Sequence, residues 1–187
     1  MRKLRVQGSV AFSALAVSAV LLALELAPAR ARAVEPGDAA PAFSAHALEG
    51  DSTISLAAYR GKVVYLDFWA SWCGPCQAAM PALESLRGEF PADQFQVLAV
   101  NVDQDPEKAK TFLSRHKVGY QMVSDPEGRL PSTYGLKTMP TSYIIDKAGV
   151  VRFVHPGFRN SDVEELRSQI KGLLGGPALP AAAEVRR

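Results

Sequence analysis

The sequence predicts an α/β fold in which helices flank a central mixed β-sheet and a β-hairpin extension lies on the N-terminal side. Two long runs of apolar and β-branched residues, Lys62–Trp69 and Gln96–Val102, are typical of strands buried on both faces of a sheet. A helical spacing of apolar residues lies between them, and strands that alternate with helices indicate a largely parallel sheet. Two later runs, Ser142–Asp146 and Val150–His155, flank the turn Lys147-Ala148-Gly149 and add antiparallel strands.

Turn signals and helical spacing place the other elements. The turn Glu49-Gly50-Asp51 separates two short runs, Phe43–Leu48 and Thr53–Leu56, and predicts the leading hairpin. The last helix is expected to have Ser161 as its N-cap and Glu164 in the capping-box position. The expected helices and the remaining strand are Pro75–Phe90, Asp105 to about His116, Gln121–Ser124 (the strand), Asp125–Tyr134 (a turn and a short helix) and Asp162–Leu174.

The composition fits one domain of ordinary size. The chain has 187 residues, 48% hydrophobic and 21% charged, which excludes collagen-like, coiled-coil and wholly disordered chains. Its two cysteines, Cys73 and Cys76, are too few for a disulfide scaffold or a four-cysteine zinc site. We expect one domain over residues 34–174, a flexible tail over 175–187, and no metal or cofactor apart from the redox-active cysteine pair.

The first 33 residues have the features of a secretory signal peptide. A basic start leads into Val10–Leu24, a 15-residue run without charge, and small residues occupy alternate positions before the expected cleavage after Ala33. The other interpretation is an uncleaved membrane anchor, because Val6–Leu24 is an uncharged stretch of 19 residues. In both cases we expect the domain to be exported to the periplasm or another extracytoplasmic compartment.

The charge of the exported part excludes one class of partner. Removing residues 1–33 changes the formal net charge from +2 to −2, because five basic residues and Glu25 are lost. A chain without excess basic charge has no electrostatic footprint for nucleic acid, so we expect no such partner. We expect a monomer, because the sequence shows no long exposed apolar stripe.

The segment Trp72-Cys73-Gly74-Pro75-Cys76 carries the chemistry. Two cysteines three residues apart at the start of a helix can close a small disulfide ring or separate into two thiols with little backbone movement. The free N–H groups and the dipole of the helix stabilise a thiolate there, so the pKa of Cys73 is expected to fall from about 8.5 towards about 7 or lower. Cys73 is therefore the expected nucleophile and Cys76 the expected resolving thiol.

Two other uses of the cysteine pair are less compatible with its spacing. A structural disulfide over four residues restrains little of the unfolded chain, so it stabilises poorly. A metal site would need further ligands, and the three histidines, His46, His116 and His155, are scattered along the chain.

Asp67 interrupts the apolar run six residues before Cys73. A carboxyl group inside a protein core costs free energy and has a raised pKa. We expect Asp67 to take the proton of Cys76 through a water molecule when the disulfide forms. The alternative is a carboxylate at the edge of the sheet, where it is solvated or caps a turn.

Two further sites are candidates for contact with a substrate. Met139-Pro140 precedes the expected strand Ser142–Asp146. This proline marks either the start of a strand or a cis peptide whose loop presents a backbone edge to a partner, and the residues leave both open. Trp72 is the aromatic residue beside Cys73 and is the expected exposed contact residue.

The segment Asp67–Cys76, DFWASWCGPC, resembles the active site of thioredoxins. The N-terminal signal, the leading hairpin region and the segment Met139–Asp146, MPTSYIID, resemble the exported TlpA/ResA-like thiol–disulfide oxidoreductases of the redoxin superfamily. The similarity covers about residues 36–174 and implies a thioredoxin-like fold. It also implies protein disulfides as substrates and a membrane thiol-electron donor as partner.

Site roles follow from the resemblance position by position. Cys73 resembles the nucleophile of the family, Cys76 the resolving thiol and Pro140 its cis proline. Two positions depart from members that serve cytochrome c maturation, since Ala79 and Asp67 stand where those members have glutamate and asparagine. The residues expected to contact substrate are Trp72, Gly74, Pro75, Met139 and Pro140.

The sequence therefore predicts an exported thiol–disulfide oxidoreductase that reduces protein disulfides. A peroxiredoxin-like peroxidase is one alternative, although the proline and the threonine or serine that precede the peroxidatic cysteine of that family are missing before Cys73. A copper- or haem-handling carrier that uses the two thiols as soft ligands is another. An oxidant or isomerase of the same fold is a third, because Gly74-Pro75 does not fix the reduction potential.

Overall fold

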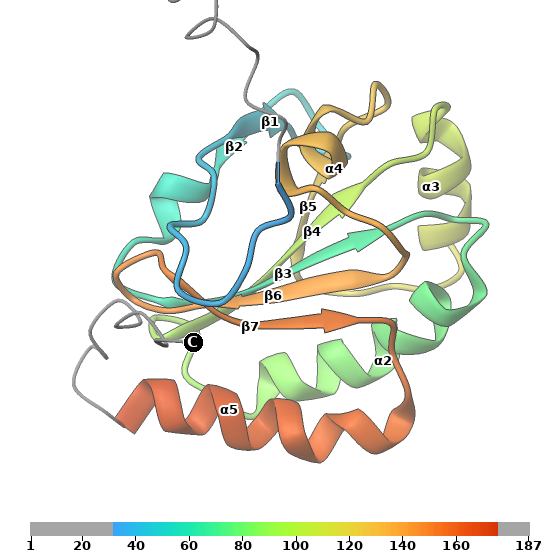
Figure 1. Ribbon diagram of the computed structural model, residues 1–187. Coiled ribbons are helices and arrows are strands. Elements are labelled where there is room, and N and C mark those ends of the chain that lie inside the picture. The colour runs from blue at the N-terminus through green and yellow to red at the C-terminus, as the bar shows by residue number, and fades with distance from the viewer. Residues whose placement is uncertain (1–31, 176–187) are drawn as a thin grey trace, which may run out of the picture. The chain divides into compact units, whose positions relative to one another are not determined.

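The structure is a computed structural model that describes residues 32–175. Its centre is a five-stranded sheet in the order β5-β4-β3-β6-β7 (Figure 1). β3 is parallel to β4, and β4 to β5, whereas β6 is antiparallel to both β3 and β7. The strands are β3 (Val63–Trp69), β4 (Phe95–Asn101), β5 (Gln121–Ser124), β6 (Thr141–Ile145) and β7 (Val151–Pro156). The predicted mixed sheet is confirmed.

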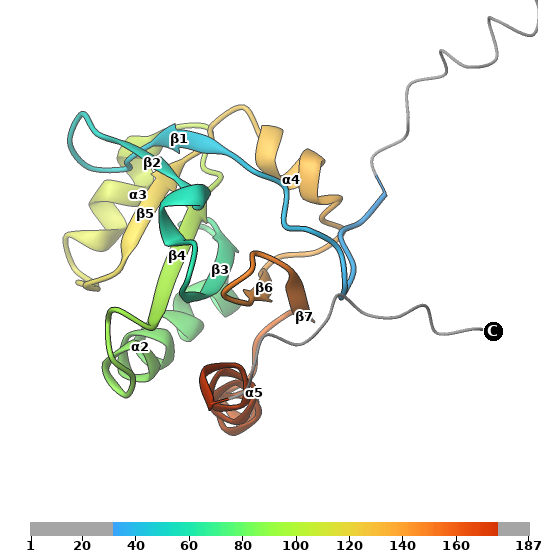
Figure 2. The same cartoon turned by 90° about the vertical axis from the view of Figure 1, so that its left-hand side faces the viewer.

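Helices cover one face of the sheet and bury the larger core cluster. α2 (Gly74–Gly88) and α5 (Val163–Gly175) run beneath the sheet, and α3 (Pro106–Leu113) lies beside its β5 end (Figures 1 and 2). Apolar side chains of α2 at helical spacing, Met80, Leu83 and Leu86, are at most 2% exposed. They pack on the inward side chains of β3 and β4, because alternate residues of a strand point to the same face.

The N-terminal part of the domain covers the opposite face. Two short antiparallel strands, β1 (Ser44–His46) and β2 (Thr53–Ser55), form the predicted hairpin, and the short helices η1 (Leu56–Tyr59) and α4 (Arg129–Tyr134) lie on the same side (Figure 2). A second core cluster lies between this layer and the sheet. Its members include Phe43, Leu56, Leu66, Phe68, Leu98, Tyr134 and Tyr143.

Residues 34–48, which include β1, form one isolated bridge near each edge of the sheet. Ala39 pairs with Val150 at the β7 edge, and Ala47 pairs with Val123 at the β5 edge. Unpaired strand edges invite pairing with other chains, and a covering segment prevents it. We call residues 34–48 the N-terminal strap.

The start of the last helix differs from its prediction. Residues Asn160–Asp162 form a separate short helix, η2, and α5 begins at Val163. Ser161 is therefore not the N-cap, and its hydroxyl contacts the Asp162 carboxylate at 3.2 Å. Asp162 accepts a hydrogen bond from the backbone N–H of Arg159 at 2.8 Å instead. The capping carboxylate lies on a tighter turn that the periodicity of the helix does not reveal.

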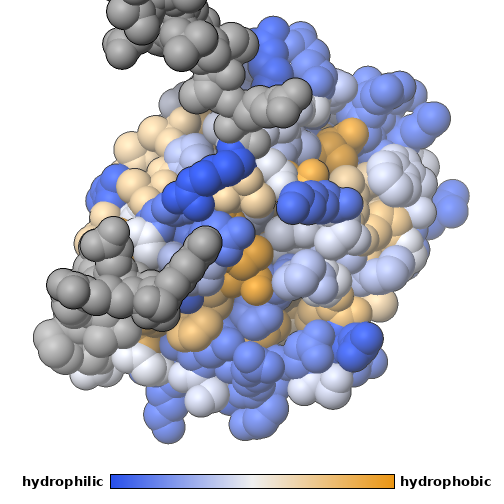
Figure 3. Space-filling model, viewed as in Figure 1, coloured by the Kyte–Doolittle hydropathy of each residue, from blue (hydrophilic) through white to orange (hydrophobic). Residues whose placement is uncertain are grey.

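The expected signal peptide, 1–33, lies almost wholly outside the described residues, as does the tail after Gly175. Within residues 32–175, no helix is both long and apolar enough to cross a membrane. Val34, the first residue after the expected cleavage point, is 8% exposed, and its N–H donates to the carbonyl of Tyr134 at 3.1 Å. The face drawn in Figure 3 is a mosaic in which hydrophilic residues separate the hydrophobic areas.

Candidate active site

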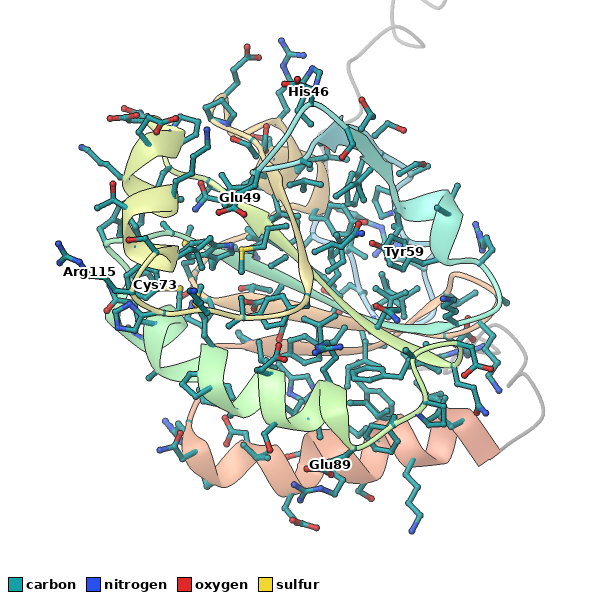
Figure 4. The ribbon with its side chains drawn as sticks, turned by 180° about the vertical axis from the view of Figure 1, so that it is seen from behind. His46, Glu49, Tyr59, Cys73, Glu89 and Arg115 are labelled. Atoms are coloured by element: carbon teal, nitrogen blue, oxygen red, sulfur yellow. A yellow bond between two sulfur atoms is a disulfide. The ribbon has the colours of Figure 1, made fainter. Side chains whose placement is uncertain are left out.

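The cysteine pair lies at the start of α2, just after the loop that follows the central strand β3. Cys73 is the N-cap residue of α2, with φ −87° and ψ 101°, and Pro75 lies in the first turn. Proline is tolerated there because the N–H that it lacks would have no partner within the helix. Cys73 and Cys76 form a disulfide with Cα atoms 5.3 Å apart. Figure 4 shows Cys73 at the N-terminal end of α2, on the side of the molecule where α3 lies.

The two sulfur atoms have different surroundings. Cys73 is 5% exposed, whereas Cys76, inside the first turn, is 0% exposed. The backbone N–H of Cys76 donates to the Sγ atom of Cys73 at 3.3 Å. Unpaired N–H groups and the dipole at a helix N-terminus stabilise negative charge on a group in this position. The geometry thus favours Cys73 as the sulfur that both meets another molecule and carries a thiolate.

Asp67 lies in β3 on the face covered by α2. It is 2% exposed, and β3 is the middle strand of the sheet, so an edge position for this carboxyl group is excluded. Its strand neighbours on the same face, Tyr65 and Trp69, belong to the core cluster that contains Cys76. Burial raises the pKa of Asp67 from 3.8 to about 8. A carboxyl group with that pKa changes protonation near neutral pH, which a proton acceptor must do.

The groups around Asp67 leave its carboxyl group without a charged partner. β4 places Ala99 next to Asp67 and β6 places Ser142 on the other side. The hydroxyl groups of Tyr65 and Ser142 are 2.7 Å apart and satisfy each other. Desolvation is the cause of the raised pKa of Asp67, and no cation within residues 32–175 opposes it.

The five predicted contact residues lie on the two loops beside the disulfide, with Met139 half-buried and Pro140 buried. Trp72 is 68% exposed, which makes it the exposed large hydrophobic residue of the described chain. The Met139–Pro140 peptide is cis, which decides between the two possibilities that the sequence left open. Thr141 pairs with Phe68, so this loop lies beside the end of β3 from which the cysteine loop starts. Gly74 and Pro75 are exposed between the two cysteines.

A group of polar residues that the sequence did not single out holds the loop before Cys73. The Asp103 carboxylate is 1% exposed and accepts hydrogen bonds from the Ser71 N–H at 2.9 Å and the Ser71 hydroxyl at 3.0 Å. It also accepts one from the side-chain amide of Asn101 at 2.8 Å. Gln77 of α2 donates to the Ser71 carbonyl. The only signal in the sequence was that Asn101 lies near the end of the expected strand Gln96–Val102 and that Asp103 directly follows it.

The candidate site contains no arrangement of metal ligands. Within residues 32–175, no three His, Cys, Asp or Glu side chains are grouped so that they could hold a metal ion. The chemistry that the described side chains support is exchange between thiols and disulfides.

Known proteins with similar sequences carry the same type of activity in their names. The sequence model of the AhpC/TSA family matches residues 36–154. The thioredoxin-like protein YneN of Bacillus subtilis is 35% identical over 127 residues, which are 66% of this chain and 73% of that protein. The thiol-disulfide oxidoreductase ResA of Geobacillus thermodenitrificans is 34% identical over 140 residues, 74% of this chain and 80% of that protein.

A comparison with solved structures points to the same type of protein as the sequence comparison. A protein of Chlorobium tepidum, assigned as the thiol:disulfide interchange protein DsbE, superposes with a TM-score of 0.73 at 42% identity. The match covers 76% of this chain and 100% of that one. The predicted thioredoxin-like fold and thiol–disulfide oxidoreductase activity are thereby confirmed. The chain belongs to the AhpC/TSA family, among its ResA-like thiol–disulfide oxidoreductases.

Proposed function

We propose that this protein reduces disulfides of other exported proteins, with Cys73 as the nucleophile and Cys76 as the resolving thiol. The observation that carries the proposal is the asymmetry of the pair. Cys73 is the helix N-cap, is 5% exposed and accepts a hydrogen bond from the Cys76 N–H, whereas Cys76 is 0% exposed. A partner disulfide therefore meets Cys73 first, and Cys76 reacts only within the molecule.

The reaction passes through a mixed disulfide. The Cys73 thiolate attacks one sulfur of the substrate disulfide, a new S–S bond forms, and the other substrate sulfur leaves with the electron pair and takes a proton from solvent. Cys76 then gives its proton to the Asp67 carboxylate and attacks Cys73. The second substrate sulfur leaves as a thiolate and takes a proton from solvent. The substrate has gained two electrons and two protons, and Cys73–Cys76 has become the disulfide.

The loop around the cis proline supports binding of an extended substrate chain. The carbonyl of Thr138 accepts from the Thr141 hydroxyl at 2.8 Å, and the carbonyl of Pro140 accepts from the Gly157 N–H at 2.7 Å. The main-chain groups of Met139 make no such bond within residues 32–175. They are therefore free to pair with the backbone beside the substrate cysteine, while the exposed Trp72 covers its side chains.

Export and electron supply belong to the same proposal. The basic and apolar pattern of residues 1–33 supports a signal peptide or anchor. A reductant in an oxidising compartment needs its disulfide reduced again, which requires a dithiol donor such as a membrane thiol transporter. Ala79 occupies the position where members that serve cytochrome c maturation have glutamate, so we propose a general range of protein disulfides as substrates.

Replacing one cysteine at a time tests these roles. With Cys76→Ser, the first attack proceeds and the second does not, so a covalent complex with a substrate such as insulin accumulates and disappears on adding dithiothreitol. With Cys73→Ser, we expect no complex and loss of insulin reduction. Non-reducing gel electrophoresis with mass spectrometry measures both. A complex through Cys76 in the Cys73→Ser variant would contradict the assignment.

A further inference from the structure

We propose that Asp103 is a positioning residue of the reaction: its carboxylate fixes the loop Ala70–Trp72 so that Cys73 stays at the N-cap of α2 once the disulfide is open. This inference rests on the proposed role of Cys73 as the nucleophile. It concerns a side chain outside the cysteine motif, contributed by the segment that follows β4.

Asp103 accepts two hydrogen bonds from Ser71 and one from Asn101. One carboxylate oxygen accepts the Ser71 N–H at 2.9 Å, the other accepts the Ser71 hydroxyl at 3.0 Å, and Asn101 donates its side-chain amide to the first at 2.8 Å. The backbone N–H of Asp103 donates in return to the Asn101 side-chain carbonyl at 3.2 Å. Asn101 is 0% exposed and Asp103 is 1% exposed, so water does not compete for these bonds.

The loop is held from both sides. Gln77 of α2 donates to the carbonyl of Ser71, and the Cys73 N–H donates to the carbonyl of Ala70 at 3.1 Å. The Val102 N–H donates to the carbonyl of Trp69 at 3.0 Å, so the β3–β4 pairing continues up to Asp103. Trp72 lies between two fixed residues and still exposes its indole ring.

These bonds matter most in the reduced protein. In the oxidised protein the disulfide itself joins Cys73 to α2. When that bond is reduced, only backbone geometry keeps the Cys73 sulfur near the Cys76 N–H, and the N-cap position that stabilises the thiolate depends on the loop. Without Asp103, the sulfur samples positions away from the helix end. Its thiolate is then less stable, and its attack at neutral pH is slower.

Two substitutions of Asp103 distinguish the effect of its hydrogen bonds from the effect of its negative charge. Asp103→Ala removes both hydrogen bonds between the carboxylate and Ser71. Asp103→Asn removes the charge but can keep the geometry: its carbonyl accepts from the Ser71 N–H and Asn101, and its NH₂ donates to the Ser71 hydroxyl, which also accepts. Removing a negative charge near a thiolate lowers its pKa, which is opposite to the effect of a lost positioning contact.

Asp125 is the matched control. It is also a buried carboxylate, 7% exposed, and it accepts the backbone N–H groups of Arg129 at 3.2 Å and Leu130 at 2.7 Å at the start of α4. Asp125→Ala therefore removes a comparable capping carboxylate without touching the loop before Cys73. We expect it to lower the melting temperature and leave the titration of Cys73 unchanged.

The experiment is a pH titration of the Cys73 thiolate by its ultraviolet absorbance in the reduced full-length protein, together with kcat/KM for insulin reduction across the same pH range. For Asp103→Ala we expect a thiolate pKa higher by about one unit and kcat/KM about 10-fold lower at pH 7. The rates of wild type and Asp103→Ala should converge near pH 9, where Cys73 is largely ionised in both proteins. Asp103→Asn should not show the rise.

The possible outcomes separate the two proposals. An Asp103→Ala variant with the wild-type titration, or an equal rise in Asp125→Ala or Asp103→Asn, would overturn the positioning role. If Asp103→Ala does not fold, Ser71→Ala removes only the hydroxyl contact, and we expect a smaller rise of the same sign; no rise would overturn the role. A wild-type protein that fails to reduce insulin would instead overturn the proposed function.

Discussion

At the scale of single residues, Asp67 couples the chemistry of the site to the stability of the fold. Its carboxyl group is buried beneath α2, and burial raises its pKa to about 8. In the unfolded chain the same group ionises near pH 4. Between these values the folded protein binds a proton that the unfolded chain releases, so the free energy of unfolding falls as the pH rises from about 4 to about 8.

Asp67→Asn should remove this dependence. The amide has no charge to desolvate, so we expect the variant to be more stable than wild type by about 3 kcal/mol at pH 8, and to approach wild type at pH 4. Urea denaturation of the oxidised proteins at several pH values measures the difference. Glu89 forms an ion pair with Arg167 at the surface, and Glu89→Gln should alter stability by less than about 1 kcal/mol. A difference for Asp67→Asn that is the same at pH 4 and pH 8 would contradict the burial of an ionisable carboxyl group.

The same substitution should slow the second chemical step. Without a carboxylate to accept the Cys76 proton, we expect resolution of the mixed disulfide to be about 10- to 100-fold slower at pH 8, while the first attack by Cys73 keeps its rate. Rapid-quench analysis of the mixed disulfide separates the two steps. Equal slowing of both, or of neither, would show that Asp67 acts on something other than the Cys76 proton.

The sequence alone was sufficient to single out those site residues that stand out from the residues around them. Two cysteines at a helix start and a carboxyl group in an apolar strand conflict with the patterns around them, and both lie where they were expected. Asp103 carried no such conflict, because an aspartate after a strand is ordinary in a loop. Only the packing of the β4 end against the β3–α2 loop shows that it holds Ser71. The residues alone left the conformation of Pro140 open; the family resemblance implied the cis peptide that the structure shows.

At the scale of elements, the N-terminal strap helps to cover one face of the sheet, as helices cover the other face. It crosses the sheet from its pairing with β7 to its pairing with β5. Phe43, near its middle, is 8% exposed and belongs to the core cluster with Phe68 and Tyr134. The strap also brings the hairpin against β5. Its Leu48 belongs to the core cluster that contains Cys73 and Cys76, whereas Phe43 belongs to the cluster on the other face of the sheet.

Phe43→Ala should therefore affect stability and not chemistry. Removing a buried phenylalanine costs about 3–4 kcal/mol, and the reduction potential of Cys73–Cys76 should stay at the wild-type value. Thermal unfolding and a redox titration of the same sample measure both quantities. Trp72→Ala is the complementary control, because the indole ring that we propose as a substrate contact is exposed and contributes little to the core. A change of potential in Phe43→Ala would mean that the strap reaches the active site.

Element boundaries show where local pattern is sufficient. β3 begins one residue after the predicted run Lys62–Trp69, because all seven of its residues are buried and an apolar run of that length marks such a strand. The short strand β5 has its predicted bounds, Gln121–Ser124. α3 ends at Leu113 rather than near His116, because turns follow the helix there and its apolar spacing does not reveal where they begin. Caps and short turns depend on single hydrogen bonds, such as that between Arg159 and Asp162, which periodicity does not record.

At the scale of the whole molecule, the order of the strands assembles the site. β3 and β4 are parallel neighbours, so their carboxyl ends carry the cysteine loop and Asp103 to one edge of the sheet. β6 runs antiparallel to β3 and begins at that edge, so it places the Met139–Pro140 loop there as well. Segments far apart in the chain thus surround Cys73, and the fold leaves that sulfur at a helix end.

The direction of electron flow is the central claim, and the reduction potential of the Cys73–Cys76 couple tests it most directly. Titration of the protein against glutathione or dithiothreitol, read by thiol alkylation, gives the value. We predict a potential near that of thioredoxin, about −270 mV, because a protein that reduces other disulfides must hold its own disulfide more stably. A value above about −180 mV would contradict a reductase and indicate an oxidant or isomerase, and the absence of a reversible two-electron couple would contradict thiol–disulfide exchange altogether.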